Sequence, residues 1–233
     1  MRFKIFLLIS LLIFNTAFSQ SKKTLALNFD YVLSAFVYPN VISSDRGLRN
    51  FSNEINNWFG FSADFRYEFV EGYFAGLSIE MVDKKISDYL IRRIGSENLR
   101  IPIEDKYTIY IAELSALFVA PFSSQKWQIY IGGGVGAYRG NFSKTILNVK
   151  SKIQKSPVNI GIHVLSGVQF NLTEKIALRG ELKFRDPIVE VESKFLDNQI
   201  NYNGYIIQID QTPFRTRVNF DTMTFVFGLV LSF

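Results

Sequence analysis

Hydrophobic and polar residues alternate along most of the chain. From residue 24 onward, one segment after another places apolar side chains at every second position, with polar residues or glycine between them. Alternation with a period of two is typical of a strand with two unlike faces. Residues 58–70 are the clearest example, with Phe61 and Phe65 on one face and Asp64 and Arg66 on the other.

Eight segments carry this alternation, and their connectors differ in length in a regular way. The segments are residues 24–36, 58–70, 74–82, 107–119, 127–138, 158–170, 176–185 and 223–233. Short connectors follow the second, fourth and sixth segments, and long ones follow the others. Because antiparallel neighbours alternate in direction, all the short turns lie at one end. The pattern predicts an all-β fold, an up-and-down antiparallel barrel of about eight strands.

The two faces of these strands indicate which one meets lipid. The apolar faces contain no charged residue, as a bilayer core requires, since Arg or Lys at its midplane costs about 2–4 kcal/mol. The polar faces carry many glycines, which weaken strands and bring no benefit on a solvent face. A narrow lumen, however, needs small side chains beside large ones. These glycines are Gly60, Gly76, Gly132, Gly134, Gly136, Gly161 and Gly167. A transmembrane barrel is therefore favoured over its rival, a soluble lipid-binding barrel.

Aromatic residues cluster near the predicted strand ends, as in the girdles of membrane barrels. At the short-turn, periplasmic end these are Phe74, Phe118, Trp127, Phe170 and Phe233. At the other end they are Trp58, Phe59 and Phe184. The girdles predict short periplasmic turns and long extracellular loops.

Two segments resemble a known family. The run WQIYIGGGVGAY at residues 127–138 and the terminal strand, with Leu229, Leu231 and Phe233 at alternate positions, are similar to small OmpA/OmpX-type barrels of Gram-negative envelopes, the outer membrane protein β-barrel domain family. The resemblance implies an integral outer-membrane protein surrounded by membrane lipid and lipopolysaccharide. It also implies that the barrel-assembly machinery, a transient partner, reads Leu229, Leu231 and Phe233.

The N-terminus is typical of an export signal. Two basic residues, Arg2 and Lys4, precede a short apolar run, and Ala17 and Ser19 follow at cleavage-like spacing. The run is shorter than the roughly 20 residues that a membrane helix needs. We expect a signal peptide at residues 1–20 and one barrel domain at 21–233.

Composition excludes several kinds of site. With no cysteine, the chain has no disulfide, thiolate metal site or lipidated cysteine. The net charge of +5 falls to about +3 without Arg2 and Lys4, which is too small to predict binding to nucleic acid. No pattern points to a cofactor or a metal. The glycine-rich run lacks the lysine and the following helix that a phosphate loop needs.

Charged residues on the polar faces are expected to fill the lumen. They are Asp30, Asp64, Arg66, Glu68, Glu80, Glu113, His163, Arg179, Glu181, Lys183, Arg185 and Asp221. Because buried charges require partners, we predict a salt-bridged, closed interior. The alternative is a narrow porin-like channel for small solutes or ions.

His163 is the only histidine and hence the one candidate for histidine-based catalysis. Ser166 lies three residues away and so faces the opposite side of the strand, where it cannot easily serve His163. We therefore predict a structural histidine and no enzyme; a lipid-modifying enzyme is a weaker alternative.

The long loops are the remaining places for specificity. Residues 139–156 contain five basic residues and no acidic one, which are Arg139, Lys144, Lys150, Lys152 and Lys155. They form either an anion-contacting loop, suited to lipopolysaccharide, or a solvated basic loop. In the last long connection, Asn203-Gly204 predicts a type I′ hairpin. We expect the seventh and eighth strands to project as a ribbon, with an edge free for a foreign strand or without a partner. The function predicted is that of a structural or surface-interaction protein, with a possible extracellular protein partner.

Overall fold

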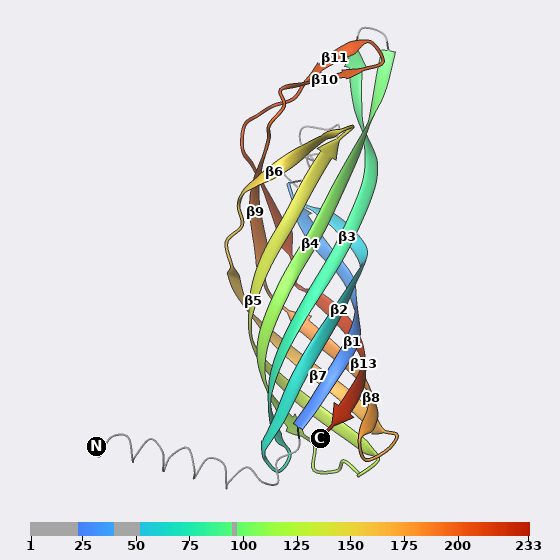
Figure 1. Ribbon diagram of the computed structural model, residues 1–233, viewed down its shortest axis with the longest axis vertical. Coiled ribbons are helices and arrows are strands. Elements are labelled where there is room, and N and C mark those ends of the chain that lie inside the picture. Colours follow the sequence, from blue (N-terminus) through green and yellow to red (C-terminus); the bar gives the residue numbers. More distant parts are fainter. Residues whose placement is uncertain (1–22, 40–51, 95–96) are drawn as a thin grey trace, which may run out of the picture.

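A computed structural model describes residues 23–39, 52–94 and 97–233, which form thirteen antiparallel β-strands (Figure 1). The strands are β1 Lys23–Tyr38, β2 Asn53–Val70, β3 Tyr73–Ile94, β4 Glu97–Val119, β5 Trp127–Ile146, β6 Val149–Lys155, β7 Asn159–Asn171, β8 Ile176–Arg185, β9 Ile188–Phe195, β10 Gln199–Tyr202, β11 Tyr205–Gln208, β12 Phe214–Asn219 and β13 Thr222–Ser232. In the described part of the chain, no helix is long and apolar enough to cross a membrane.

Eight of these strands close into a ring, which confirms the predicted barrel. The order is β1-β2-β3-β4-β5-β7-β8-β13, and β13 pairs back onto β1 from Ser232 to Thr224. The backbone N–H of Phe233 donates to Lys23 O at 2.9 Å, and Lys23 N–H donates to Phe233 O at 3.1 Å. The described start and the end of the chain therefore lie together at the end with the short turns, as predicted (Figure 1). The expected signal peptide lies outside the described residues.

The barrel wall continues beyond this ring. Farther from the termini, β6, β9 and β12 take over from β7, β8 and β13: β5 pairs with β6, β6 with β9, β9 with β12, and β12 with β1. The β10–β11 hairpin lies against the tip of the β3–β4 ribbon (Figure 1). We call the eight-stranded ring the membrane section and the remainder, which begins at Val82 on β3, Ile109 on β4 and Gly140 on β5, the outer section.

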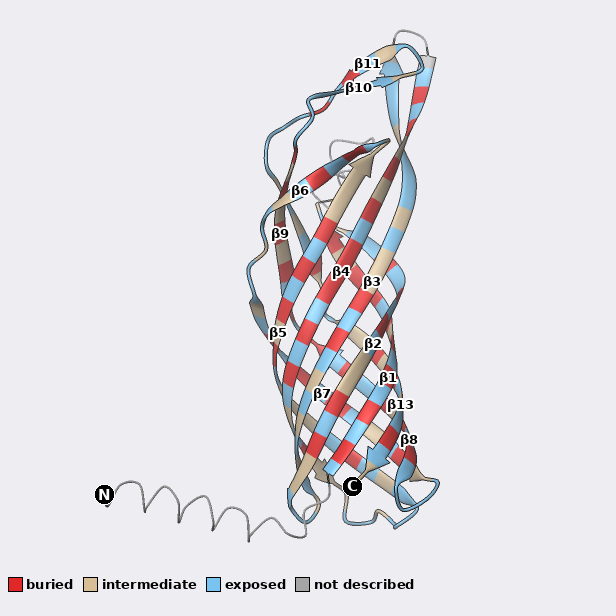
Figure 2. Cartoon of the chain, viewed as in Figure 1, coloured by how far each residue is buried: buried red, intermediate tan, exposed pale blue. Residues whose placement is uncertain are grey.

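In the membrane section the faces are arranged as predicted. Outward side chains are apolar and exposed, with 67% exposure for Leu27 and Phe61 and 61% for Ile79, whereas charged side chains inside are buried. Figure 2 shows buried and exposed positions alternating along the strands. Such a continuous apolar belt is the surface that a bilayer covers.

In the outer section the faces are reversed. A buried apolar cluster fills its interior, including Val82, Tyr107, Ile109, Phe142 and Phe220. The outward face is charged and exposed instead, because it meets water. The same strands thus enclose a charged interior in the membrane section and an apolar interior in the outer section.

A change of inward parity accompanies this reversal in β2. Asn57 has a φ of 61°, and the residues around it, Ile55 and Trp58, are both buried although they differ in parity. The register between β1 and β2 is the same on both sides of this point, so no residue is inserted in either strand. The prediction of Trp58 in the outer girdle is wrong: Trp58 has the parity of Asp64, which faces the lumen. It is fully buried, and its indole N–H donates to Ile55 O at 2.7 Å.

Phe74 also departs from the predicted girdle. It faces the interior and packs against Leu117, Tyr130 and Leu165. The position follows from its parity in β3, where its neighbours Tyr73 and Ala75 face outward. The other predicted girdle residues lie on the exterior: Phe59, Trp127, Phe184 and Phe233 are exposed, and Phe118 and Phe170 are half-buried.

Two predicted loops are strands. The third connection is almost wholly a ribbon of β3 and β4, with Ile94 opposite Glu97, and residues 139–156 form the hairpin of β5 and β6. These strands carry charged residues on their outer face. They therefore lack the apolar outer face by which a membrane strand is identified. The Asn203-Gly204 hairpin is confirmed, with φ values of 51° and 81° that suit a type I′ turn.

Glycines and tyrosines fill the narrow lumen jointly. A Cβ on Gly167 would lie 2.5 Å from the Tyr130 hydroxyl oxygen, and one on Gly136 would lie 2.7 Å from that of Tyr138. Each tyrosine therefore occupies the space that the glycine leaves open, as expected for alternating small and large residues.

Candidate functional site

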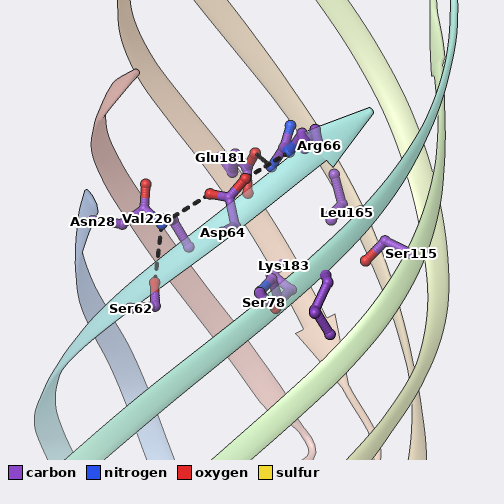
Figure 3. A pocket seen from close by; sticks show the side chains of 12 residues that line it. Asn28, Ser62, Asp64, Arg66, Ser78, Ser115, Leu165, Glu181, Lys183 and Val226 are labelled. Atoms are coloured by element: carbon purple, nitrogen blue, oxygen red, sulfur yellow. Dashed lines mark hydrogen bonds and ion pairs between the residues drawn. The ribbon is translucent and has the colours of Figure 1, made fainter. Parts of the chain in front are cut away.

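The lumen of the membrane section contains two groups of paired charges. The group nearer the termini consists of Asp64, Arg66, Arg179 and Glu181, of which Figure 3 shows Asp64, Arg66 and Glu181. Arg179 Nη1 lies 2.6 Å from Asp64 Oδ2, Arg66 Nε lies 2.9 Å from Asp64 Oδ1, and Arg66 also pairs with Glu181. The Tyr130 hydroxyl donates to Glu181 at 2.6 Å. Two acids and two bases balance, and each belongs to a strand of the ring.

The second group lies farther along the barrel and consists of Glu80, Glu113, Lys183 and Arg185. Lys183 Nζ and Arg185 Nε each lie 2.8 Å from a carboxylate oxygen of Glu113, and Arg185 also pairs with Glu80. The Tyr138 hydroxyl donates to Glu113 at 2.9 Å. This group is also neutral, and Glu113 is its centre because it accepts from four side chains, the fourth being the Ser78 hydroxyl at 3.5 Å.

Asp30 is the odd charge in this arrangement. It is fully buried, it lies in no ion pair within the described residues, and neither of its carboxylate oxygens accepts a hydrogen bond there. Since the two groups are balanced without it, Asp30 adds one acid that the lumen does not compensate. An isolated buried carboxylate is costly, so Asp30 is expected to lower the stability of the folded barrel.

His163 has a partner that the sequence did not reveal. Its Nε2 lies 2.9 Å from Ser115 Oγ on a different strand, and its Nδ1 lies 3.8 Å from Glu113 Oε1. Ser166 is exposed on the opposite face, as predicted. The Ser115 contact depends on β4 and β7 facing each other across β5, which no local pattern could indicate.

Little space remains between these side chains. The cavity beside Ser115 has a volume of about 20 Å³, which is room for one water molecule. It is lined by residues of both ion-pair groups, including Asp64, Arg66 and Lys183 (Figure 3). This cavity has no room for a molecule much larger than water.

Besides Asp30 and His163, two predicted lumen residues lie outside the ion-pair groups. Glu68 is half-buried at the periplasmic end, where it accepts a hydrogen bond from the Gly72 backbone N–H at 2.9 Å. Asp221 is exposed, so its predicted lumen position is wrong. Asp221 precedes β13 and lies outside the alternating segment. Alternation therefore does not predict which way its side chain points.

The predicted basic loop is divided between two environments. Lys144 points inward and pairs with Asp105 at 2.5 Å. Arg139, Lys150, Lys152 and Lys155 are exposed. Lys144 therefore belongs to the interior of the outer section, and only the other four are open to a ligand.

The environment of Asp105 also affects Tyr107. Burial, together with the neighbouring Asp105 carboxylate, raises the pKa of Tyr107 above its ordinary value. The hydroxyl thus remains neutral at physiological pH and can stay in the apolar interior of the outer section.

Sequence reasoning also missed two exposed cations next to this hairpin. Lys85 and Lys106 lie opposite each other on β3 and β4, and Lys106 is also opposite Ser143 of β5. Arg139 lies opposite Tyr110 at the border of the apolar belt. Strand register, which brings these cations to one outer face, was the missing information.

The expected free edge of the last long connection is present only in part. Both β9 and β12 have neighbours on each side, whereas β10 and β11 pair only with each other in the described chain. A further free edge, which was not predicted, lies on β3. In the described chain, β3 beyond Asp83 pairs only with β4. The Tyr89 N–H donates to the Asp88 side chain at 2.7 Å, which partly covers this edge.

Comparison with known proteins shows the fold. The sequence matches no protein-family model and no curated protein. The structure is similar to the outer membrane protein OprG from Pseudomonas aeruginosa, with 13% identity, a TM-score of 0.57, and coverage of 91% of this chain and 96% of OprG. The chain has the fold of a small outer-membrane β-barrel.

Two further solved structures overlap less closely. Ail, the attachment invasion locus protein of Yersinia pestis, is 12% identical with a TM-score of 0.48, and 91% of this chain and 99% of Ail are covered. The outer membrane protease OmpT from Escherichia coli is 7% identical with a TM-score of 0.46, and 91% and 96% are covered. At such identities the likeness concerns the fold and not the activity.

Proposed function

We propose that this protein is an integral outer-membrane barrel with a closed lumen, which acts without catalysis as a surface-interaction protein through its outer section. The observation that supports this most is the contrast between a lumen filled by two ion-pair groups and an outer section whose β3 edge is unpaired in the described chain. Function would then depend on the outer surface.

The proposal includes a route to the membrane. Residues 1–20 act as a cleaved signal, and residues 21–233 form the mature barrel. The barrel-assembly machinery reads Leu229, Leu231 and Phe233, which are all exposed on the apolar belt, at 49%, 46% and 69%. Mass spectrometry of the protein purified from the outer-membrane fraction should give a chain starting near Gln20 or Ser21.

Planar-bilayer recording tests the closed lumen. We expect no reproducible conductance steps from the wild-type protein, because the cavity beside Ser115 has room for only one water molecule. Reproducible steps would favour the narrow porin-like channel. Glu113→Ala is a positive control, since it removes the carboxylate at the centre of one ion-pair group.

The β3 edge is suited to an extended segment of a partner protein. Tyr89 lies opposite Pro102, whose carbonyl accepts from the Leu147 N–H on its other side at 3.0 Å. The backbone of Tyr89 is therefore directed away from β4, and so is that of Ser87 two residues earlier. Such edges accept an added strand through main-chain hydrogen bonds.

A library of displayed ten-residue peptides, selected on the barrel in nanodiscs, tests this edge. Selected peptides should slow hydrogen exchange of the amides in residues 85–91. Ser87→Pro removes one edge-directed N–H and should weaken binding at least tenfold, whereas the matched Ser87→Ala should bind as the wild type does. Equal binding by Ser87→Pro, or protection confined to other strands, would contradict the proposed edge.

The exposed cations supply a second contact, with lipopolysaccharide. Arg139 and Lys106 lie just outside the apolar belt, where the phosphate groups of the outer leaflet would meet them. Neutralising both with glutamine should lower co-purified lipopolysaccharide several-fold. Arg215→Gln is the control, since Arg215 is also exposed but pairs with Glu190 and Glu192. No difference from this control would leave Arg139 and Lys106 as solvated charges.

A further inference from the structure

An apolar groove lies on the outer surface of the membrane section. Its volume is about 550 Å³, within the range of roughly 300–1,000 Å³ that is typical of ligand pockets. It runs across the ends of β3 and β4 and the adjoining parts of β5 and β7. The nine residues that line it are Phe69, Tyr73, Ala116, Leu117, Phe118, Ile131, Gly132, Val164 and Leu165.

Small residues make this part of the belt concave. Strand register places Ala75 beside Ala116, Ala116 beside Gly133, and Gly133 beside Val164. All of these positions face outward, so the row has little side-chain volume. Larger side chains project from the periplasmic side of the groove, where the ring centroids of Tyr73 and Phe118 lie 5.0 Å apart.

The position of the groove limits what can occupy it. Tyr73 is the first residue of β3, and Phe118 is next to the last of β4, so the groove lies at the end with the short turns and the termini. That end is periplasmic in a barrel of this type. The surrounding leaflet is the inner one, composed of phospholipid.

The lining excludes the other occupants. No lining residue is charged, and a peptide segment would leave its backbone polar groups unsatisfied in such a groove. A second copy of the chain would need an interface of about 20–30 residues a side, far more than the nine that line the groove. A hydrocarbon chain has no polar group to satisfy and follows a narrow concave surface.

We propose that this groove binds one acyl chain of a phospholipid from the periplasmic leaflet and holds it as a specific structural lipid. Ala116 and its neighbours form the floor, and Phe118 and Tyr73 form the wall next to the headgroup. The inference goes beyond the proposed surface interaction and depends only on the membrane embedding of the barrel.

Native mass spectrometry of the barrel released from nanodiscs of palmitoyl-oleoyl phosphatidylethanolamine tests the groove. The wild type should retain one phospholipid on most molecules. Ala116→Leu fills the floor and should reduce the lipid-bound fraction at least fivefold. The matched control is Ala112→Leu, an identical change at an outward position four residues away on β4.

Phe118→Ala keeps the test decisive if Ala116→Leu does not fold. It removes a wall without adding volume and should also release the lipid, while heat-dependent gel mobility reports whether each variant is folded. Absence of retained lipid on the wild type would overturn the proposal. So would equal retention by wild type and folded Ala116→Leu or Phe118→Ala, retention of lipopolysaccharide in place of phospholipid, or a dimer.

Discussion

The membrane section and the outer section share the five strands β1 to β5 but face opposite surroundings. In the membrane section the outward face of β4 is apolar and its interior carries Glu113; in the outer section the interior carries Ile109 and the outward face carries Lys106. The inward parity of β4 does not change between them. What changes is which face the hydrophobic effect drives inward, because the solvent outside changes from lipid to water.

The two interiors are therefore stabilised by different forces. The membrane section cannot gain stability by hiding apolar side chains, since lipid is as apolar as they are. Its specificity lies in backbone pairing and the balanced ion pairs. The outer section has a water-excluded apolar core like that of a soluble protein. Substitutions should therefore have opposite costs in the two sections.

The largest effect is expected from Glu113→Gln in the membrane section. The change leaves Lys183 and Arg185 buried without their shared carboxylate, which should lower the free energy of unfolding by about 3–5 kcal/mol. Urea unfolding in liposomes measures it. The double variant Glu113→Gln/Lys183→Met should be less destabilised than the single one, and a larger loss would show that the lumen is not a charge-balance system.

A smaller loss is expected from Ile109→Ala in the outer section. Ile109 is fully buried in the apolar cluster, so its truncation should cost about 2–4 kcal/mol. The same change at Ile79, which is lipid-facing, should cost less than about 1 kcal/mol, because lipid fills the space. Equal costs at the two sites would remove the distinction between the sections.

Asp30→Asn is expected to stabilise the barrel. The substitution retains the shape and removes the one lumen charge without a partner in the described chain, which should raise the free energy of unfolding by about 1–2 kcal/mol. The same urea titration applies. Asp64→Asn provides the contrast, since Asp64 is paired with two arginines and its neutralisation should destabilise. Destabilisation by both changes would mean that Asp30 is compensated.

The smallest effect is expected from the outward ion pair of Lys85 and Glu104. Their side chains are 60% and 41% exposed at a separation of 2.8 Å, so Lys85→Gln should change stability by less than about 1 kcal/mol. A loss comparable to that of Glu113→Gln would imply that water does not screen the outer section.

The strands and faces of the membrane section could be predicted from the sequence alone. Alternation at a period of two identifies the eight ring strands, their lumen-facing glycines and all eight charged residues that meet in the two ion-pair groups, because each face needs only local spacing to be assigned. The Asn203-Gly204 turn was also predictable, since its backbone conformation depends on two residues.

The outer strands and the contacts between distant strands could be assigned only from the tertiary structure. Reversed faces hid the outer strands, which cannot be assigned without knowing where lipid gives way to water. The contact of Ser115 with His163 and the free edge of β3 depend on which strands become neighbours. Spacing along one strand determines which side a residue faces, but only closure of the barrel determines what it meets there.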